Sequence, residues 1–222
     1  MTMKKKWWKV LTIALLIYSI LGALLFDVPR LAILNETIRN LHFHVTMWFA
    51  MIILLTTSAI YAIKYLRTNN LNHDHISVEF ANAGVLFGIL GITTGALWAN
   101  FTWGEPWSGD PKQNSSAIAL LIYLAYLVLR NSLEDGQQKA RISAIYNVFA
   151  YAALIPLLFI LPRMTDSSLH PGNGGNPGFN AYDLDSRLRM VFYPAVIGWT
   201  LLGVWLVSLR VRLRKIKMEL ED

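Results

Sequence analysis

Residues 45–66 read VTMWFAMIILLTTSAIYAIKYL and contain one charged side chain, Lys64. A helix needs roughly 20 apolar residues to cross a hydrocarbon core about 30 Å thick. Inside a bilayer the backbone polar groups must be satisfied within the protein, and a helix does this within one segment. The stretch is therefore predicted to be a transmembrane helix.

Similar apolar blocks recur along the whole chain, and the remaining stretches are polar or rich in Pro, Gly and Asn. The composition agrees, because 55% of the 222 residues are hydrophobic and 15% are charged, whereas soluble domains carry about 25% charged residues. No alternating ten-residue pattern of a β-barrel occurs. We expect an all-α polytopic membrane protein that forms a single integral membrane domain, 1–222. Its six transmembrane helices are predicted at approximately 8–27, 45–66, 78–99, 115–131, 142–162 and 189–210.

The first apolar block follows a basic segment, Met1 to Lys9, as the hydrophobic region of a signal peptide would. After it comes Asp27-Val28-Pro29-Arg30 and not a small-residue cleavage site. We therefore expect the block to be retained as the first helix.

Basic residues predict the orientation, because inner loops are enriched in Lys and Arg. With the N-terminus inside, 14 of the 20 basic residues fall on the inner side and both termini are cytoplasmic. The net charge of +6 then reflects orientation and contact with anionic lipid, not a nucleic-acid surface. The chain has no cysteine, which excludes disulfides, thiolate metal sites and thioether attachment to this chain.

Three features fall on the outer side in this topology. His44 begins the second span, a tryptophan-rich loop covers 98–114, and His170 lies in the loop 163–187 between the last two spans. Haem iron accepts two axial imidazoles, indole rings can pack against a porphyrin, and its propionates attract Arg or Lys. A haem held by two histidines is therefore one chemical interpretation. The ordinary one is a belt of interfacial Trp residues with solvated histidines and an anchoring Arg39, and residue types alone favour it.

The haem interpretation gains support from a motif. The run Thr94-Gly95-Ala96-Leu97-Trp98-Ala99, followed by Trp103-Gly104, Trp107-Ser108 and Asp110-Pro111-Lys112, resembles the tryptophan-rich WWD signature of the haem-handling proteins of cytochrome c maturation. Six spans, this length and one short WWD loop are similar to the haem exporter protein C (CcmC) branch. The CcsA and CcmF branches are usually larger. Gly109 and Pro106 stand where that signature usually has aromatic residues.

The resemblance implies a role for each matching residue. His44 and His170 would be the axial ligands of haem b, a transient and delivered substrate, and Arg39 would meet a propionate. Asp110 is expected to orient the loop through backbone hydrogen bonds and not to touch iron. The remaining matches are Trp98, Trp103 and Trp107, as an apolar shelf, and Lys112, as the basic residue common in the family.

The resemblance also implies partners and a location. Haem would be presented on the periplasmic side of a bacterial inner membrane and passed to a CcmE-like haem chaperone. The other partners would be CcmA/CcmB-like ABC transporter subunits and a small CcmD-like membrane subunit. This chain has no P-loop motif for ATP. The alternatives are a CcsA-type subunit of a cytochrome c synthase, a b-type cytochrome subunit, a small-solute transporter and a subunit without a ligand.

Overall fold

The computed structural model describes residues 6–30, 33–134, 136–165, 168–170 and 184–221, and within these ranges every regular element is helical. Six helical segments are long and apolar enough to cross a membrane, which confirms the all-α prediction. The elements are α1 (Trp7–Leu25), the short 3-10 helix η2 (Asn35–Asn40), α2 (Leu41–Thr68), α3 (Leu71–Trp103), α4 (Pro111–Asn131), α5 (Gly136–Ile155), the π-helical turn η3 (Pro156–Ile160), the 3-10 turn η4 (Leu161–Met164) and α6 (Ser186–Glu221).

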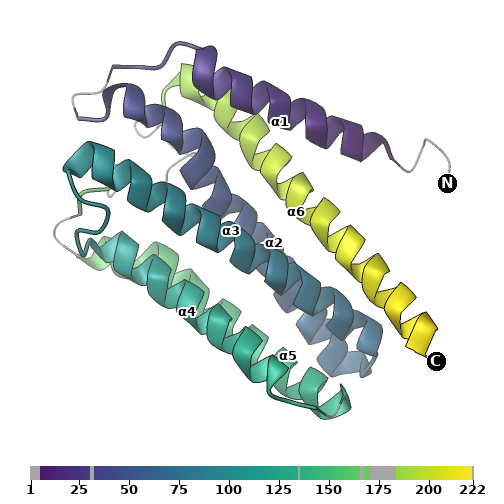
Figure 1. Ribbon diagram of the computed structural model, residues 1–222. Coiled ribbons are helices and arrows are strands. Elements are labelled where there is room, and N and C mark those ends of the chain that lie inside the picture. Colours follow the sequence, from purple (N-terminus) through teal and green to yellow (C-terminus); the bar gives the residue numbers. More distant parts are fainter. Residues whose placement is uncertain (1–5, 31–32, 135, 166–167, 171–183, 222) are drawn as a thin grey trace.

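The long helices lie side by side in a bundle (Figure 1). Helix α2 packs most extensively against α3, α1 packs against α6, and α4 packs against α5. Helix α1 begins and α6 ends at the same end of the bundle, which we call the terminal end; the turns 69–70 and 131–134 lie there too. The segments 26–30, 33–40, 104–110 and 168–170 lie at the opposite end, which we call the loop end.

Large apolar side chains remain exposed on the outer faces of the helices. Examples are Leu121, Val128 and Phe149, each more than half exposed. A soluble protein rarely leaves such extensive apolar faces uncovered, whereas lipid tails solvate them well. The exposed faces therefore agree with a multi-pass membrane protein.

Helix α3 is longer than the predicted span at both ends. The side chain of Asn70 caps its start by accepting a hydrogen bond of 2.9 Å from the backbone N–H of Asn72. Its end is at Gly104, whose φ of +87° suits glycine. Residues 98–103 of the predicted outer loop 98–114 are thus helical, and residues 111–114 belong to α4. Of the predicted histidine loop 163–187, residues 166–167 and 171–183 lie outside the described residues.

A row of glycines on α3 brings α2 close. Gly84, Gly88, Gly91 and Gly95 lie against Leu55, Met51, Trp48 and His44 of α2, in that order. A Cβ atom at Gly84 would come within 2.5 Å of Leu55, and one at Gly95 within 2.4 Å of the His44 ring. Small residues allow such close approach between membrane helices. This seam fixes the register of α2 on α3 and puts His44 beside the last turns of α3.

Candidate functional site

His44 lies in the first turns of α2 with its imidazole fixed by α3. Nδ1 is 2.9 Å from the carbonyl oxygen of Gly91. A carbonyl oxygen can only accept, so Nδ1 carries the proton and Nε2 keeps its lone pair. Nε2 has no hydrogen-bond partner among the described residues. This is the tautomer that a metal-ligating histidine uses when its other nitrogen is hydrogen-bonded.

Trp98 forms the next part of the site, on the last turns of α3. Its ring meets His44 edge-on, with 5.8 Å between the centroids. Its Nε1 donates a hydrogen bond of 3.1 Å to Oγ1 of Thr37, in η2. Trp48 meets the same imidazole from α2 at 6.3 Å. The His44 ring is therefore bordered by two indoles whose orientation is set by packing and one side-chain hydrogen bond.

Asp110 connects the tryptophan loop to the segment that carries His170. It is the N-cap of α4, and its Oδ1 accepts a hydrogen bond of 2.8 Å from the backbone N–H of Lys112. Its Oδ2 accepts from the hydroxyl of Ser168 at 2.8 Å and from the backbone N–H of Leu169 at 2.7 Å. The carboxylate is buried, with 5% of the residue exposed. Asp110 thus holds two loops together, which is the orienting role expected for it.

His170 completes this group. Its Nδ1 lies 2.8 Å from Oδ1 of Asp110, at an angle that departs from a linear hydrogen bond. Trp103 packs on the ring, with 5.2 Å between centroids and 60° between planes. Because an ionised carboxylate can only accept hydrogen bonds, the contact favours the tautomer with a proton on Nδ1 and a lone pair on Nε2. In both histidines Nδ1 therefore faces an oxygen acceptor, and Nε2 keeps its lone pair.

The charge of His170 follows from its surroundings. Burial lowers the pKa of His170, and the Lys112 cation lowers it further, while Asp110 opposes both effects. Burial would raise the pKa of Asp110, but His170 and the hydrogen bonds from Ser168, Lys112 and Leu169 outweigh it and lower that pKa. At neutral pH the pair is therefore a carboxylate beside a neutral imidazole, the form that binds a metal.

Both histidines flank the C-terminal end of α3, where Trp98 contacts one and Trp103 the other. Two imidazoles with indole neighbours fit a flat apolar ligand whose metal needs only two further ligands, such as haem.

The other residues singled out from the sequence take different positions. Arg39 donates from Nη1 to the carbonyl oxygens of Ala23, at 3.0 Å, and Phe26, at 2.7 Å, and pairs through Nε with Glu36. The guanidinium therefore fastens the end of α1. Trp107 is 41% exposed, unlike the two indoles that pack on the histidines. Lys112 is near enough to His170 to affect its charge.

The backbone conformation at Gly109 explains one departure from the WWD signature. Gly109 has a φ of +74°, a conformation that side-chain-bearing residues rarely adopt. A tryptophan there would strain this backbone. The loop 104–110 therefore reaches Asp110 by a turn that glycine favours.

Sequence reasoning did not identify four residues that hold the site. Thr37 orients Trp98 by accepting its hydrogen bond, and Ser168 donates a hydrogen bond to Asp110. The carbonyl oxygen of Gly91 accepts a hydrogen bond from His44, and Gly95 provides room for the His44 ring. The glycine spacing on α3 was a usable signal, since small residues repeat one per helical turn. Nothing local in the sequence marks Thr37 or Ser168, which act through contacts with distant residues.

Comparison with known proteins yields one family. The profile of the family described as cytochrome C assembly protein matches residues 1–170. The cytochrome c biogenesis protein CcsA of Pelargonium hortorum is 39% identical over 95 residues, 42% of this chain and 30% of that protein. CcsA of Cuscuta reflexa is 30% identical over 131 residues, 57% of this chain and 42% of that protein. CcsA of Thermosynechococcus vestitus is 39% identical over 71 residues. The matched segments thus span less than half of each relative.

Proposed function

Because this chain belongs to the cytochrome c assembly protein family, we propose that it binds haem as a transient cargo during cytochrome c biogenesis, between His44 and His170 at the loop end. Family membership and the six apolar helices make it a multi-pass membrane protein of cytochrome c biogenesis. What we propose beyond this is that His44 and His170 bind the iron, that haem is the cargo, and that it is passed on to a partner protein.

One observation carries the proposal. Nδ1 of His44 faces a carbonyl oxygen and Nδ1 of His170 faces a carboxylate oxygen, at 2.9 and 2.8 Å. Each contact favours the Nδ1-protonated tautomer, which leaves Nε2 as the donor atom for iron. The two ligands differ in their attachment. His44 belongs to a packed helix, whereas His170 lies in a loop held by Asp110, so we expect His170 to be the ligand released when haem leaves.

Within the family, the names of the matched relatives favour a CcsA-type subunit of a cytochrome c synthase over the CcmC branch expected from the sequence. The acceptor of the haem would then be an apocytochrome c, which carries a C-x-x-C-H motif. The CcmC-like role, with a CcmE-like chaperone and an ABC module, is the second candidate. It is favoured by the six spans of the chain.

A spectrum tests the haem site. The protein and its His44→Ala and His170→Ala variants are purified in mild detergent from haem-replete cells, and haem per chain is measured by absorption. The wild type is expected to show a low-spin bis-imidazole spectrum, and each variant to retain at least about tenfold less haem. Added imidazole is expected to restore part of the low-spin signal. His73→Ala, at the terminal end, is the matched control. Retention of the wild-type spectrum by both site variants would reject the two ligands.

A second experiment separates the two branches. Tagged protein is crosslinked in membranes that contain both an apocytochrome c with its C-x-x-C-H motif and a CcmE-like chaperone. Capture of the apocytochrome, lost on Cys→Ala substitution in its motif, supports the synthase role. Capture of the chaperone together with the ABC subunits supports the CcmC-like role. Capture of neither by haem-loaded protein would count against both.

A further inference from the structure

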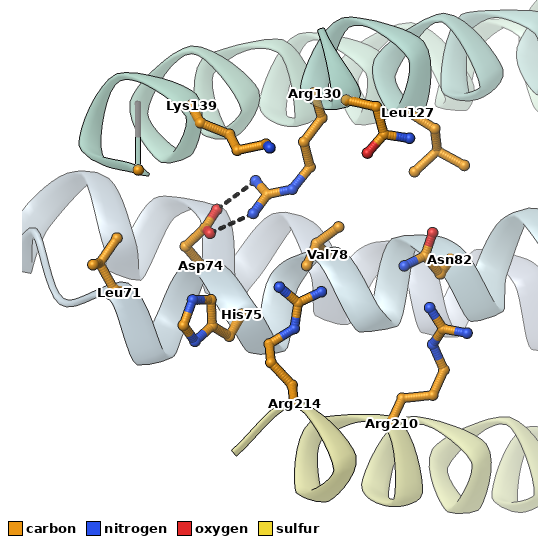
Figure 2. Close-up of a pocket in the computed structure, with 12 residues that line it drawn as sticks. Leu71, Asp74, His75, Val78, Asn82, Leu127, Arg130, Lys139, Arg210 and Arg214 are labelled. Atoms are coloured by element: carbon orange, nitrogen blue, oxygen red, sulfur yellow. Dashed lines mark hydrogen bonds and ion pairs between the residues drawn. The ribbon is translucent and has the colours of Figure 1, made fainter. Parts of the chain in front are cut away.

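A polar cavity lies at the terminal end, across the bundle from His44 and Asp110. It has a volume of about 370 Å³ and is bordered by α3, α4, α5 and α6 (Figure 2). Four of its lining side chains are cationic and come from three helices: Arg130, Lys139, Arg210 and Arg214. His75 and Asn82 of α3 line it as well. None of these residues takes part in the proposed haem site.

The innermost cation is paired. Arg130 donates from Nη1 and Nη2 to the two carboxylate oxygens of Asp74, at 2.7 and 2.6 Å, and both residues are buried. Figure 2 shows this bidentate pair between α3 and α4, with the Lys139 side chain extending towards it from α5. Such a pair neutralises itself, so it shapes the cavity without adding net charge.

The other two arginines share one carboxylate. Glu79 accepts from Nε of Arg214 at 3.1 Å and also pairs with Nε of Arg210. Its side chain is 3% exposed, whereas those of Arg214 and Arg210 are 35% and 55% exposed. One carboxylate cannot neutralise two guanidinium groups. One positive charge therefore remains at this side of the cavity.

Lys139 adds a second positive charge that no described residue balances. It makes no hydrogen bond or ion pair with any residue in the described part of the chain. Among the described residues, four cations thus face two carboxylates, Asp74 and Glu79. A net charge of +2 in a partly desolvated cavity favours an anion with several acceptor oxygens.

We propose that this cavity binds a phosphate group. Lys139, Arg210 and Arg214 supply the attraction. His75 supplies a further hydrogen-bond donor, and Asn82 supplies the amide hydrogen that it does not donate to Glu79. The excess of basic residues assigns the terminal end to the cytoplasmic side, where basic cavities between membrane helices meet anionic phospholipid headgroups. The phosphate group is either part of such a lipid headgroup or part of a soluble anion, and the experiment below distinguishes these two sources.

The test variant removes the excess charge and keeps both carboxylates paired. Lys139→Gln with Arg210→Gln leaves Asp74 with Arg130 and Glu79 with Arg214. Arg141→Gln with Arg212→Gln is the matched control, because it removes the same charge from the same two helices at exposed positions that do not line the cavity. Lys139→Gln alone disturbs neither carboxylate pair and serves if the double variant does not fold.

The full chain is purified in detergent, and bound lipid is measured by native mass spectrometry during titration with phosphatidylglycerol or phosphatidylcholine. We expect one phosphatidylglycerol to bind the wild type and the control, with affinity reduced about 30-fold in the double variant and about fivefold in Lys139→Gln. A parallel titration uses inorganic phosphate, with thermal unfolding as readout.

The outcomes distinguish the sources. Preference for phosphatidylglycerol over phosphatidylcholine, lost in the double variant, assigns the phosphate to a lipid. Stabilisation by inorganic phosphate, lost in the same variant and without a lipid preference, assigns it to a soluble anion. Equal behaviour of the two double variants overturns the proposal, and so does a wild type that responds to neither titrant. Haem content does not enter this readout, so failure here leaves the proposed function untouched.

Discussion

Nδ1 of His44 lies 2.9 Å from the carbonyl oxygen of Gly91, and the same imidazole rests on Gly95, one helical turn further along α3. One helix face thus fixes both the tautomer and the position of the ring. Neither effect needs a polar side chain on α3, because a backbone oxygen accepts the hydrogen bond and the missing Cβ provides the space. A ligand residue can therefore be oriented by a pattern of glycines.

Substitution at Gly95 tests this arrangement. A Cβ there would lie 2.4 Å from Cε1 of His44, so Gly95→Ala must displace the ring. We expect at least about tenfold less retained haem, with helical content unchanged by circular dichroism. Gly136→Ala is the control, because a Cβ at Gly136 meets nothing within 4 Å. Wild-type haem content in Gly95→Ala would show that the ring position is not critical.

The titration of His170 should respond in opposite directions to its two charged neighbours. Its pKa is lowered from the ordinary value of 6.5, chiefly by burial. Lys112→Gln removes a cation that disfavours protonation, so the pKa should rise. Asp110→Asn removes the anion that favours protonation, so it should fall further. Histidine-ring NMR of the haem-free protein, assigned with His170→Gln, measures all three midpoints. Shifts of the same sign would contradict the described contacts.

The three tryptophans of the loop should contribute unequally. Trp98 and Trp103 each pack on a histidine, at 5.8 and 5.2 Å, whereas Trp107 is 41% exposed. We expect Trp98→Ala and Trp103→Ala to reduce haem retention severalfold through loss of ring orientation, and Trp107→Ala to reduce it less. Haem per chain is the measurement. The largest loss with Trp107→Ala would instead make that exposed indole the main haem contact.

The buried pair of Asp74 and Arg130 should be necessary for stability in a way that a surface pair is not. Their side chains are 5% and 7% exposed. Asp74→Asn leaves a buried guanidinium uncompensated, and we expect about 3–5 kcal/mol of destabilisation, measured by unfolding in detergent. Arg187→Gln breaks the exposed pair with Asp185 and should leave the unfolding midpoint unchanged. Equal midpoints for the two variants would rule out this role.

The six spans could be predicted from the sequence because hydropathy is a local property. Each apolar block must become a helix in lipid, whatever its neighbours are. Alternation of the spans then places His44, the tryptophan loop and the segment before His170 at one end of the bundle. The bounds were less predictable, because caps such as Asn70 lie among polar residues. As a result, His73-Asp74-His75, whose composition suggests a loop, lies in the first two turns of α3.

The sequence by itself determined the membrane helices, the end at which the histidines and indoles gather, and the family. Only the tertiary structure decided which atoms meet. Arg39 fastens the end of α1, the carboxylate of Asp110 faces His170, and Glu79 holds two arginines from α6. The physical reason is that the free energy of inserting a helix into lipid is a sum over the residues of that one segment. Ion pairs and histidine tautomers instead depend on the register between two helices. That register is fixed by close packing, such as the glycine seam of α3 against α2.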